Sequence, residues 1–165
     1  HFDMVRVGVG LYGLHPADTT RDKLELTQAM SVRARVTRAV QPNVGEGVGY
    51  GMTYRIAHEG TQVCTIPLGY ADGLSRVYSN NLSVLCQGRR LRQLGNICMD
   101  QCMFEVDLRS YARRRRVDPQ VGDEVLIVGQ QGDAMVTIEE MCETLNTIPH
   151  ELCIGFAQRM PRYYV

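Results

Sequence analysis

A succession of short apolar segments separated by turn residues is the feature that most constrains the fold. Residues 30–37 alternate apolar and polar side chains, with Met30, Val32, Ala34 and Val36 as the apolar set. This period of two is that of a half-buried β-strand. Further strand-like segments follow at short spacings, at residues 62–69, 82–88, 90–99, 102–108 and 123–129. Such a rhythm predicts a mostly β fold, either a barrel or a sandwich.

Other segments depart from this rhythm. TIEEMCETLN (137–146) places its apolar residues at i, i+3, i+4 and i+7, which is one face of a helix. Thr137 is the expected N-cap of this helix, and Glu140 three residues later completes a capping box. HELCIGF (150–156) predicts a second short helix. Near the start, MVRVGVGLYG (4–13) indicates a buried strand at Met4–Val9 that runs into a turn.

The charge and hydropathy patterns exclude several classes of partner. The formal net charge is zero and the sequence pI is about 7.1, which argues against a nucleic-acid binder. The run Arg113–Arg116 has no interleaved aromatic residues and is expected to be a solvated loop. No apolar run approaches the roughly 18 residues of a membrane helix, and the profile of a signal peptide is lacking. We therefore expect a cytoplasmic protein with no nucleic-acid partner and no membrane segment.

The cysteines and the single lysine limit the chemistry further. The six cysteines include no CxxC pair, and the nearest spacing, Cys98 to Cys102, suits zinc poorly. We expect no metal site, and buried thiols that remain reduced and pack as small hydrophobic groups. Among the eighteen basic residues Lys23 alone is a lysine, and its polar surroundings predict a solvated side chain.

Two tyrosines stand among glycines. Tyr50 lies between Gly49 and Gly51, and Tyr70 follows Gly69 in PLGYADG. Glycine is favoured where the backbone needs a positive φ or comes close to another part of the chain. A tyrosine in such a place is usually a packing residue with a hydrogen-bonded hydroxyl group. A functional interpretation therefore depends on the other motifs that accompany these two.

Five motifs occur in one order: VRVGVGLYG (5–13), VGYGMTYR (48–55), IPLGYADGLSR (66–76), GNICMDQCM (95–103) and QRMPR (158–162). Together they resemble the C-terminal part of the bacterial, pyridoxal-phosphate-dependent alanine racemases, over essentially the whole chain. The resemblance implies that residues 15–165 form the family's C-terminal β-domain, a closed Greek-key-like β-barrel with one or two short helices. Residues 1–14 would be the last strand and the phosphate-binding turn of a truncated N-terminal (β/α)8 barrel.

The same resemblance implies an activity. The family interconverts L- and D-alanine for cell-wall (peptidoglycan) synthesis by two-base proton transfer at Cα, in a homodimer whose active sites are shared between subunits. Its cofactor, pyridoxal 5′-phosphate, is held by a lysine of the N-terminal barrel, which this sequence lacks. We therefore expect this chain to be inactive by itself.

Residue roles follow from the matching motifs. Tyr50 matches the catalytic base, Tyr70 the tyrosine that narrows the entry channel, and Arg76 an arginine of the substrate corridor. Met99 matches the residue whose backbone N–H holds the substrate carboxylate, with Asp100 as its companion. Because a phenol has a pKa near 10, a tyrosine base needs a neighbouring positive charge that favours its ionised form.

The resemblance also implies a cofactor set near the start of the chain. Arg6 matches the arginine at the pyridine nitrogen, and Gly8 and Val9 match backbone amides that bind the phosphate. Arginine can only donate a hydrogen bond, so the ring nitrogen stays unprotonated and the cofactor is a weaker electron acceptor. This favours racemisation, whereas an acidic residue there would favour a decarboxylase of the same architecture, the alternative enzyme. A non-catalytic β-domain that dimerises is the alternative outside enzymes.

The chain departs from the family's pattern at two positions. Gln158 stands where the family has a tyrosine that binds the cofactor phosphate and crowds the substrate pocket. The shorter amide should enlarge the pocket, so we expect that serine is accepted as well as alanine. Asn96 stands where an arginine is common in the corridor, so one positive charge on the route of an incoming carboxylate is lost.

Overall fold

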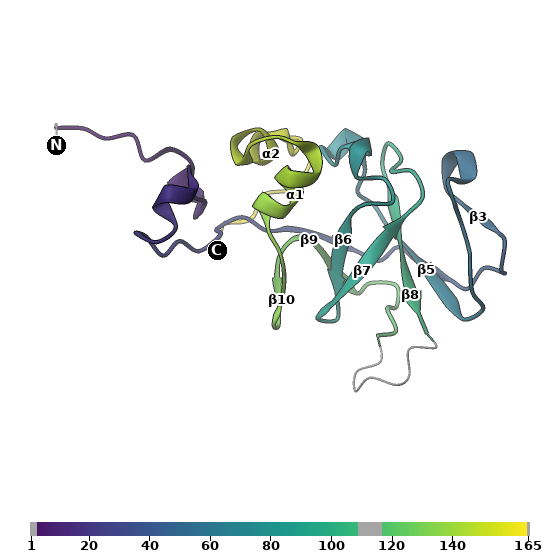
Figure 1. Cartoon of the computed structure of the whole chain (residues 1–165). Coiled ribbons are helices and arrows are strands. Elements are labelled where there is room, and N and C mark those ends of the chain that lie inside the picture. Colours follow the sequence, from purple (N-terminus) through teal and green to yellow (C-terminus); the bar gives the residue numbers. More distant parts are fainter. Residues whose placement is uncertain (1–2, 109–116, 165) are drawn as a thin grey trace.

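The computed structural model describes residues 3–108 and 117–164, so the run Arg113–Arg116 lies outside the described residues. The described part is mostly β, with two α-helices packed beside the sheet (Figure 1). Its main sheet has eight strands: β1 (Val32–Arg35), β2 (Arg38–Val40), β5 (Thr61–Ile66), β6 (Ser83–Cys86), β7 (Arg89–Leu94), β8 (Cys102–Asp107), β9 (Glu124–Gln131) and β10 (Ala134–Val136). The predicted fold class is confirmed.

All pairings in the main sheet are antiparallel. The order is β1-β9-β6-β7-β8-β5-β2, and β10 pairs with β9. Strands β1 and β2 stand at opposite ends of this order, yet only Val36 and Thr37 separate them in the chain. Val36 donates to Asp123 and Thr37 to Thr65, so one continuous segment joins both ends of the order. This arrangement is consistent with the expected barrel, although β1 and β2 are not paired with each other by ladder hydrogen bonds.

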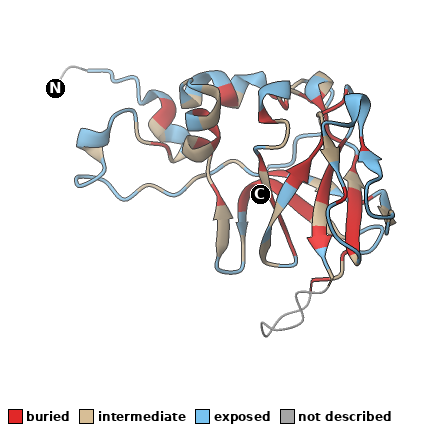
Figure 2. Ribbon diagram, turned by 45° about the vertical axis from the view of Figure 1, so that its right-hand side comes forward, coloured by how far each residue is buried: buried red, intermediate tan, exposed pale blue. Residues whose placement is uncertain are grey.

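The predicted strand segments from residue 30 onward overlap observed strands, although the segments at 62–69 and 90–99 extend beyond the ends of β5 and β7. The alternation over residues 30–37 appears in β1, where Val32 is buried, its neighbours Arg33 and Arg35 are exposed and Ala34 is half-buried. Strand β5 is buried on both faces, as expected for a strand between two others. Most buried residues of the sheet belong to one large core, and a smaller cluster contains Val63, Leu94 and Met103 of β5, β7 and β8. Figure 2 shows the buried residues concentrated in the strands.

Both predicted helices are present. Helix α1 (Ile138–Leu145) begins at Thr137, whose Oγ1 accepts a hydrogen bond from the Glu140 N–H at 3.1 Å. The second half of the expected capping box is not formed, because the Glu140 carboxylate binds the Arg90 guanidinium on β7 instead. A charged, bidentate partner outcompetes a backbone N–H for that carboxylate. Helix α2 (Pro149–Gly155) follows after a short connection.

The N-terminal segment differs from the expected strand. Residues 3–7 form no ladder, and Gly8–Tyr12 is a 3-10 helix, η1, at the end of the molecule away from β3 (Figure 1). A β-strand needs a hydrogen-bonded neighbour, and among the described residues none lies beside this segment. Val9 and Leu14 are nevertheless buried and belong to the main core.

The cysteines and the lysine behave as predicted. All six thiols are free; five are buried and Cys153 is half-buried. Burial raises the pKa of the Cys64 and Cys102 thiols to about 12, so they remain protonated and unreactive. Lys23 is exposed. Within residues 3–108 and 117–164 there is no cluster of metal-ligating side chains and no helix able to cross a membrane.

A buried tyrosine connects the sheet loops to helix α1. Tyr78 is fully buried, and its hydroxyl donates to the Met141 carbonyl at 3.0 Å. It ends η5 (Arg76–Tyr78), the turn that carries Arg76. The position of Arg76 is thereby fixed against the helix.

We predict that Tyr78→Phe lowers the free energy of unfolding by about 1 kcal/mol, because a buried carbonyl loses its donor while the ring still packs. Urea denaturation of both proteins measures this. Tyr164→Phe is the control, since Tyr164 is 94% exposed and its hydroxyl contributes nothing to the fold. Equal unfolding midpoints for Tyr78→Phe and wild type would contradict the prediction.

Candidate active site

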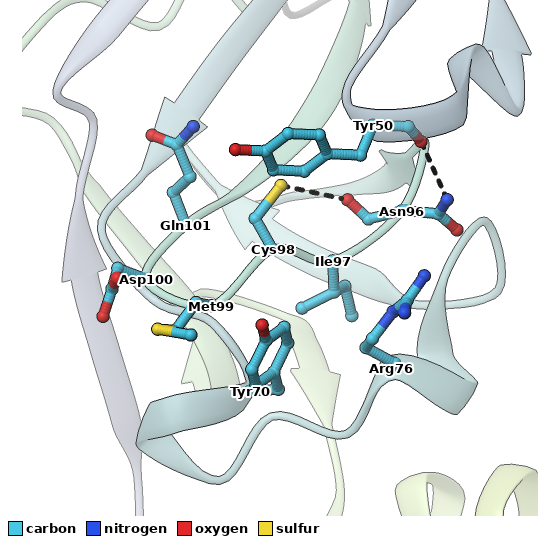
Figure 3. A pocket seen from close by; sticks show the side chains of 9 residues that line it. All are labelled: Tyr50, Tyr70, Arg76, Asn96, Ile97, Cys98, Met99, Asp100 and Gln101. Carbon is cyan, nitrogen blue, oxygen red and sulfur yellow. Dashed lines mark hydrogen bonds between the residues drawn. The ribbon is translucent and has the colours of Figure 1, made fainter.

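A pocket of about 590 Å³ lies where several loops meet at one end of the sheet. The nine residues that line it are Tyr50, Tyr70, Arg76, Asn96, Ile97, Cys98, Met99, Asp100 and Gln101 (Figure 3). The sheet register explains why they meet. Ile66, the last residue of β5, pairs with Cys102, the first residue of β8. The loop after β5 and the loop before β8 therefore leave the sheet side by side.

The first tyrosine stands on a turn that glycine makes feasible. Tyr50 begins η3 (Tyr50–Met52), between β3 (Gly47–Val48) and β4 (Tyr54–Arg55). Gly49 has φ 68° and Gly51 has φ 74°, a backbone region that other residues rarely adopt. The Asn96 amide donates to the Tyr50 carbonyl at 2.8 Å and fixes the turn to the neighbouring loop. The Tyr50 side chain is 76% exposed.

The second tyrosine is held by backbone contacts. Tyr70 begins η4 (Tyr70–Asp72); its N–H donates to the Cys98 carbonyl at 3.0 Å, and the Ala71 N–H donates to the Met99 carbonyl at 2.9 Å. Gly69 permits this approach, because a Cβ there would lie 2.3 Å from the Cys98 carbonyl oxygen. In Figure 3 Tyr50 and Tyr70 lie on either side of the segment that carries Cys98 and Met99.

The loop before β8 presents backbone groups to the pocket. The Cys98 N–H donates to the Gln101 carbonyl at 2.9 Å, which closes a tight turn around Met99 and Asp100. No acceptor among the described residues binds the Met99 N–H. Arg76 is the single cation among the pocket's described lining residues. A free N–H and a guanidinium on one pocket are suited to an anionic ligand such as a carboxylate.

The structure brings together five of the predicted site residues, namely Tyr50, Tyr70, Arg76, Met99 and Asp100. Gln158 does not line the pocket; it is exposed beside Arg159, which contacts Asp100. Sequence reasoning gave no role to Cys98 or Gln101 as lining residues, nor to Asp72 and Arg159 behind the pocket. The one feature of the sequence that could have indicated these four residues is that each lies inside one of the five motifs.

The predicted cofactor set lies elsewhere. Arg6 and Gly8 are exposed and Val9 is buried, all at the N-terminal end that Figure 1 places opposite β3. Gly8 has φ +64° and no atom within 4 Å of the position a Cβ would take. The backbone there is open to close approach by a phosphate group, so these residues fit the role that the resemblance implies. Within one copy of the chain they do not meet Tyr50.

Fold and pocket together define a mostly β domain that presents a polar pocket on its loops. An alanine racemase of Synechocystis sp. is 44% identical over 165 residues, which are 100% of this chain and 42% of that protein. The alanine racemase structure of Bacillus anthracis with bound L-Ala-P matches with a TM-score of 0.86 and 30% identity, over 96% of this chain and 39% of that one. That of Bartonella henselae, with covalently bound pyridoxal phosphate, matches with a TM-score of 0.81 and 29% identity, over 96% and 40%.

The model of the alanine racemase C-terminal domain matches residues 29–164. The chain belongs to this family. It spans about two-fifths of the length of the relatives it matches.

We predict that Gly69→Ala lowers the free energy of unfolding by about 1–3 kcal/mol, because the added methyl group overlaps the Cys98 carbonyl. The Tyr70 and Ala71 amides should also lose hydrogen-exchange protection. Urea denaturation and amide exchange measure the two effects. Gly155→Ala is the matched control, since nothing lies within 4 Å of its Cβ position. The same stability for both variants would refute the proposed contact.

Proposed function

We propose that this chain is part of a pyridoxal-phosphate-dependent racemase that interconverts L- and D-alanine, with Tyr50 as one of two opposed bases. The observation that carries the proposal is the pocket itself, where Tyr50, Arg76 and the free Met99 N–H meet. Family membership supports the reaction, since the relatives are alanine racemases. We place the enzyme in the cytoplasm, because six free thiols fit a reducing compartment.

The residues of the pocket divide the work. Racemisation removes a proton from Cα on one face and returns one on the other, so the Tyr50 oxygen has to accept and donate a proton on its face. Arg76, the single cation among the pocket's described lining residues, supplies positive charge on the route of the substrate carboxylate. The Met99 N–H binds the substrate carboxylate and orients Cα, with Asp100 beside it. Tyr70, on the other side of this loop, narrows the entry.

The cofactor supplies an electron sink that makes the α-proton removable. Arg6 would donate to its ring nitrogen, and the backbone amides of Gly8 and Val9 would hold its phosphate. Residues 1–14 then belong to a lysine-bearing N-terminal barrel, and residues 15–165 to the β-domain. The bound pyridoxal phosphate of the Bartonella henselae relative supports this cofactor.

Because Arg6 and Tyr50 lie at opposite ends of one copy, we infer a homodimer in which each active site takes Tyr50 from one subunit and the cofactor from the other. Arg6 also favours a racemase over a decarboxylase, since arginine leaves the ring nitrogen unprotonated.

In the full-length protein, Tyr50→Phe should lower kcat for alanine about 10²–10⁴-fold, the usual contribution of a positioned acid–base group. Racemisation of L- and D-alanine, followed by circular dichroism, measures it. Tyr54→Phe, at the start of the adjacent strand β4, is the control. Burial and the hydrogen bond to Glu105 raise the pKa of Tyr54 to about 12, so this phenol cannot serve as the base. Full-speed turnover by Tyr50→Phe in both directions would refute the assignment.

Gln158 lies outside the pocket of a single copy, and we propose that it faces the substrate in the shared site of the dimer. Gln158→Tyr in the same protein should then lower kcat/KM for serine relative to alanine, because a larger ring fills the space that a hydroxymethyl group occupies. Two substrates that differ by one methylene or hydroxyl group are discriminated by about 10-fold or more in a closed pocket. Gln130→Tyr is the control, because Gln130 is an exposed position near the end of the otherwise buried strand β9. An unchanged alanine-to-serine ratio would end the serine proposal.

A further inference from the structure

A buried carboxylate lies directly behind the pocket. Asp72 is the single charged residue in the buried set of the described chain, with a side chain that is 10% exposed. Its Oδ2 accepts from the Gly69 N–H at 2.8 Å, and its carbonyl oxygen accepts from the Ala157 N–H at 2.9 Å. A buried charge is stable only when it is paired and hydrogen-bonded. Asp72 therefore needs a fixed cation.

Arg159 is that cation, and it joins two carboxylates. Its Nε donates to Asp72 Oδ1 at 2.7 Å, and its Nη2 donates to Asp100 Oδ1 at 2.7 Å. The hydrogen bonds to Asp72 and then to Asp100 raise the pKa of Arg159 above its ordinary value. The planar guanidinium holds its Nε and Nη2 donors in a fixed geometry, so it binds the two carboxylates with less loss of side-chain freedom than a lysine ammonium would.

The charge of Asp100 makes this contact matter for ligand binding. Asp100 follows Met99, whose free N–H is the proposed site of the substrate carboxylate. An unpaired Asp100 carboxylate would repel a substrate carboxylate bound at the neighbouring Met99 N–H. The Asp100 side chain is 62% exposed, so its pair with Arg159 adds little to folding stability. The main effect of the Arg159–Asp100 pair is to reduce the negative charge that an incoming amino acid encounters at the pocket.

Resting on the proposed function, we propose that Arg159 is a positioning residue that neutralises Asp100 and ties it to buried Asp72, and so sets the affinity of the pocket for the substrate carboxylate. Asp72 provides the fixed end of the link, because it is also bonded to the turn of Tyr70 and to the chain before Gln158. One guanidinium thus holds three segments of the site together: η4, the Met99 loop and the C-terminal stretch.

The test compares steady-state alanine racemisation by the full-length holoenzyme with Arg159→Ala, Arg159→Lys, Asp100→Asn and the double variant Arg159→Ala/Asp100→Asn. Arg159→Ala should raise KM about tenfold with a much smaller change in kcat, the size of effect expected for a partly solvated charge. Arg159→Lys should recover part of the affinity, since it restores the charge without the fixed planar fork of the guanidinium. The double variant should have a lower KM than Arg159→Ala, because the repelling charge is gone.

A merely structural role for Arg159 predicts a different pattern. The double variant would then bind no better than Arg159→Ala, or the loss would fall on kcat; either result overturns the proposal. Should Arg159→Ala fail to fold, the comparison of Arg159→Lys with Arg159→Lys/Asp100→Asn decides in the same way.

Binding of propionate by calorimetry separates this proposal from the proposed function. Propionate carries the carboxylate without the amino group, so its Kd should follow the same order among the variants whether or not the protein racemises alanine. A wild type that binds propionate in this order but lacks racemase activity would refute the proposed function alone. Racemisation with an unchanged propionate Kd in Arg159→Ala would refute the role of Arg159 alone.

Discussion

The contact between two backbone turns is the constraint on which the site depends. The turn after β5 and the turn before β8 are joined by hydrogen bonds from Tyr70 and Ala71 to the carbonyls of Cys98 and Met99. Each such bond contributes about 1 kcal/mol to stability. Their main consequence is that they fix the position of one turn relative to the other. The two turns leave neighbouring strands at the paired residues Ile66 and Cys102, so the sheet register determines how the pocket is assembled. Rigid strands thereby position residues that lie on loops.

Arginine serves this domain in ways that lysine could not. Arg90 binds Glu140 with both Nη1 and Nη2, and Arg159 spans Asp72 and Asp100. Both links join segments far apart in the sequence and rely on the fixed fork of the guanidinium. A chain with zero net charge can therefore still contain strongly directed local fields around its pocket. The almost complete absence of lysine from the sequence is consistent with this use.

Local sequence patterns predicted most of the strands and helices. The predictions that failed are those in which contacts between distant residues determine the structure. The alternation of residues 30–37 and the period of α1 depend on one segment at a time, so the sequence was sufficient. The strand expected at Met4–Val9 needs neighbours that no local pattern supplies. The Glu140 carboxylate binds Arg90, fifty positions away in the sequence, instead of completing the predicted capping box. The link from Arg159 to Asp72 crosses 87 positions, so only the motifs that contain these residues could have drawn attention to them.

The exposure of Tyr50 is informative about how the whole enzyme is built. A phenol that is 76% exposed is solvated, whereas proton transfer at a carbon atom requires a site from which water is excluded. Among the described residues the proposed cofactor set lies at the opposite end of the molecule from this ring (Figure 1). The proposed second subunit would meet both requirements at once, since its contact would bury the phenol and bring the cofactor to it. In the proposed homodimer the glycines beside Tyr50 would shape a turn that contacts the other subunit, and the active site would be complete only in the dimer.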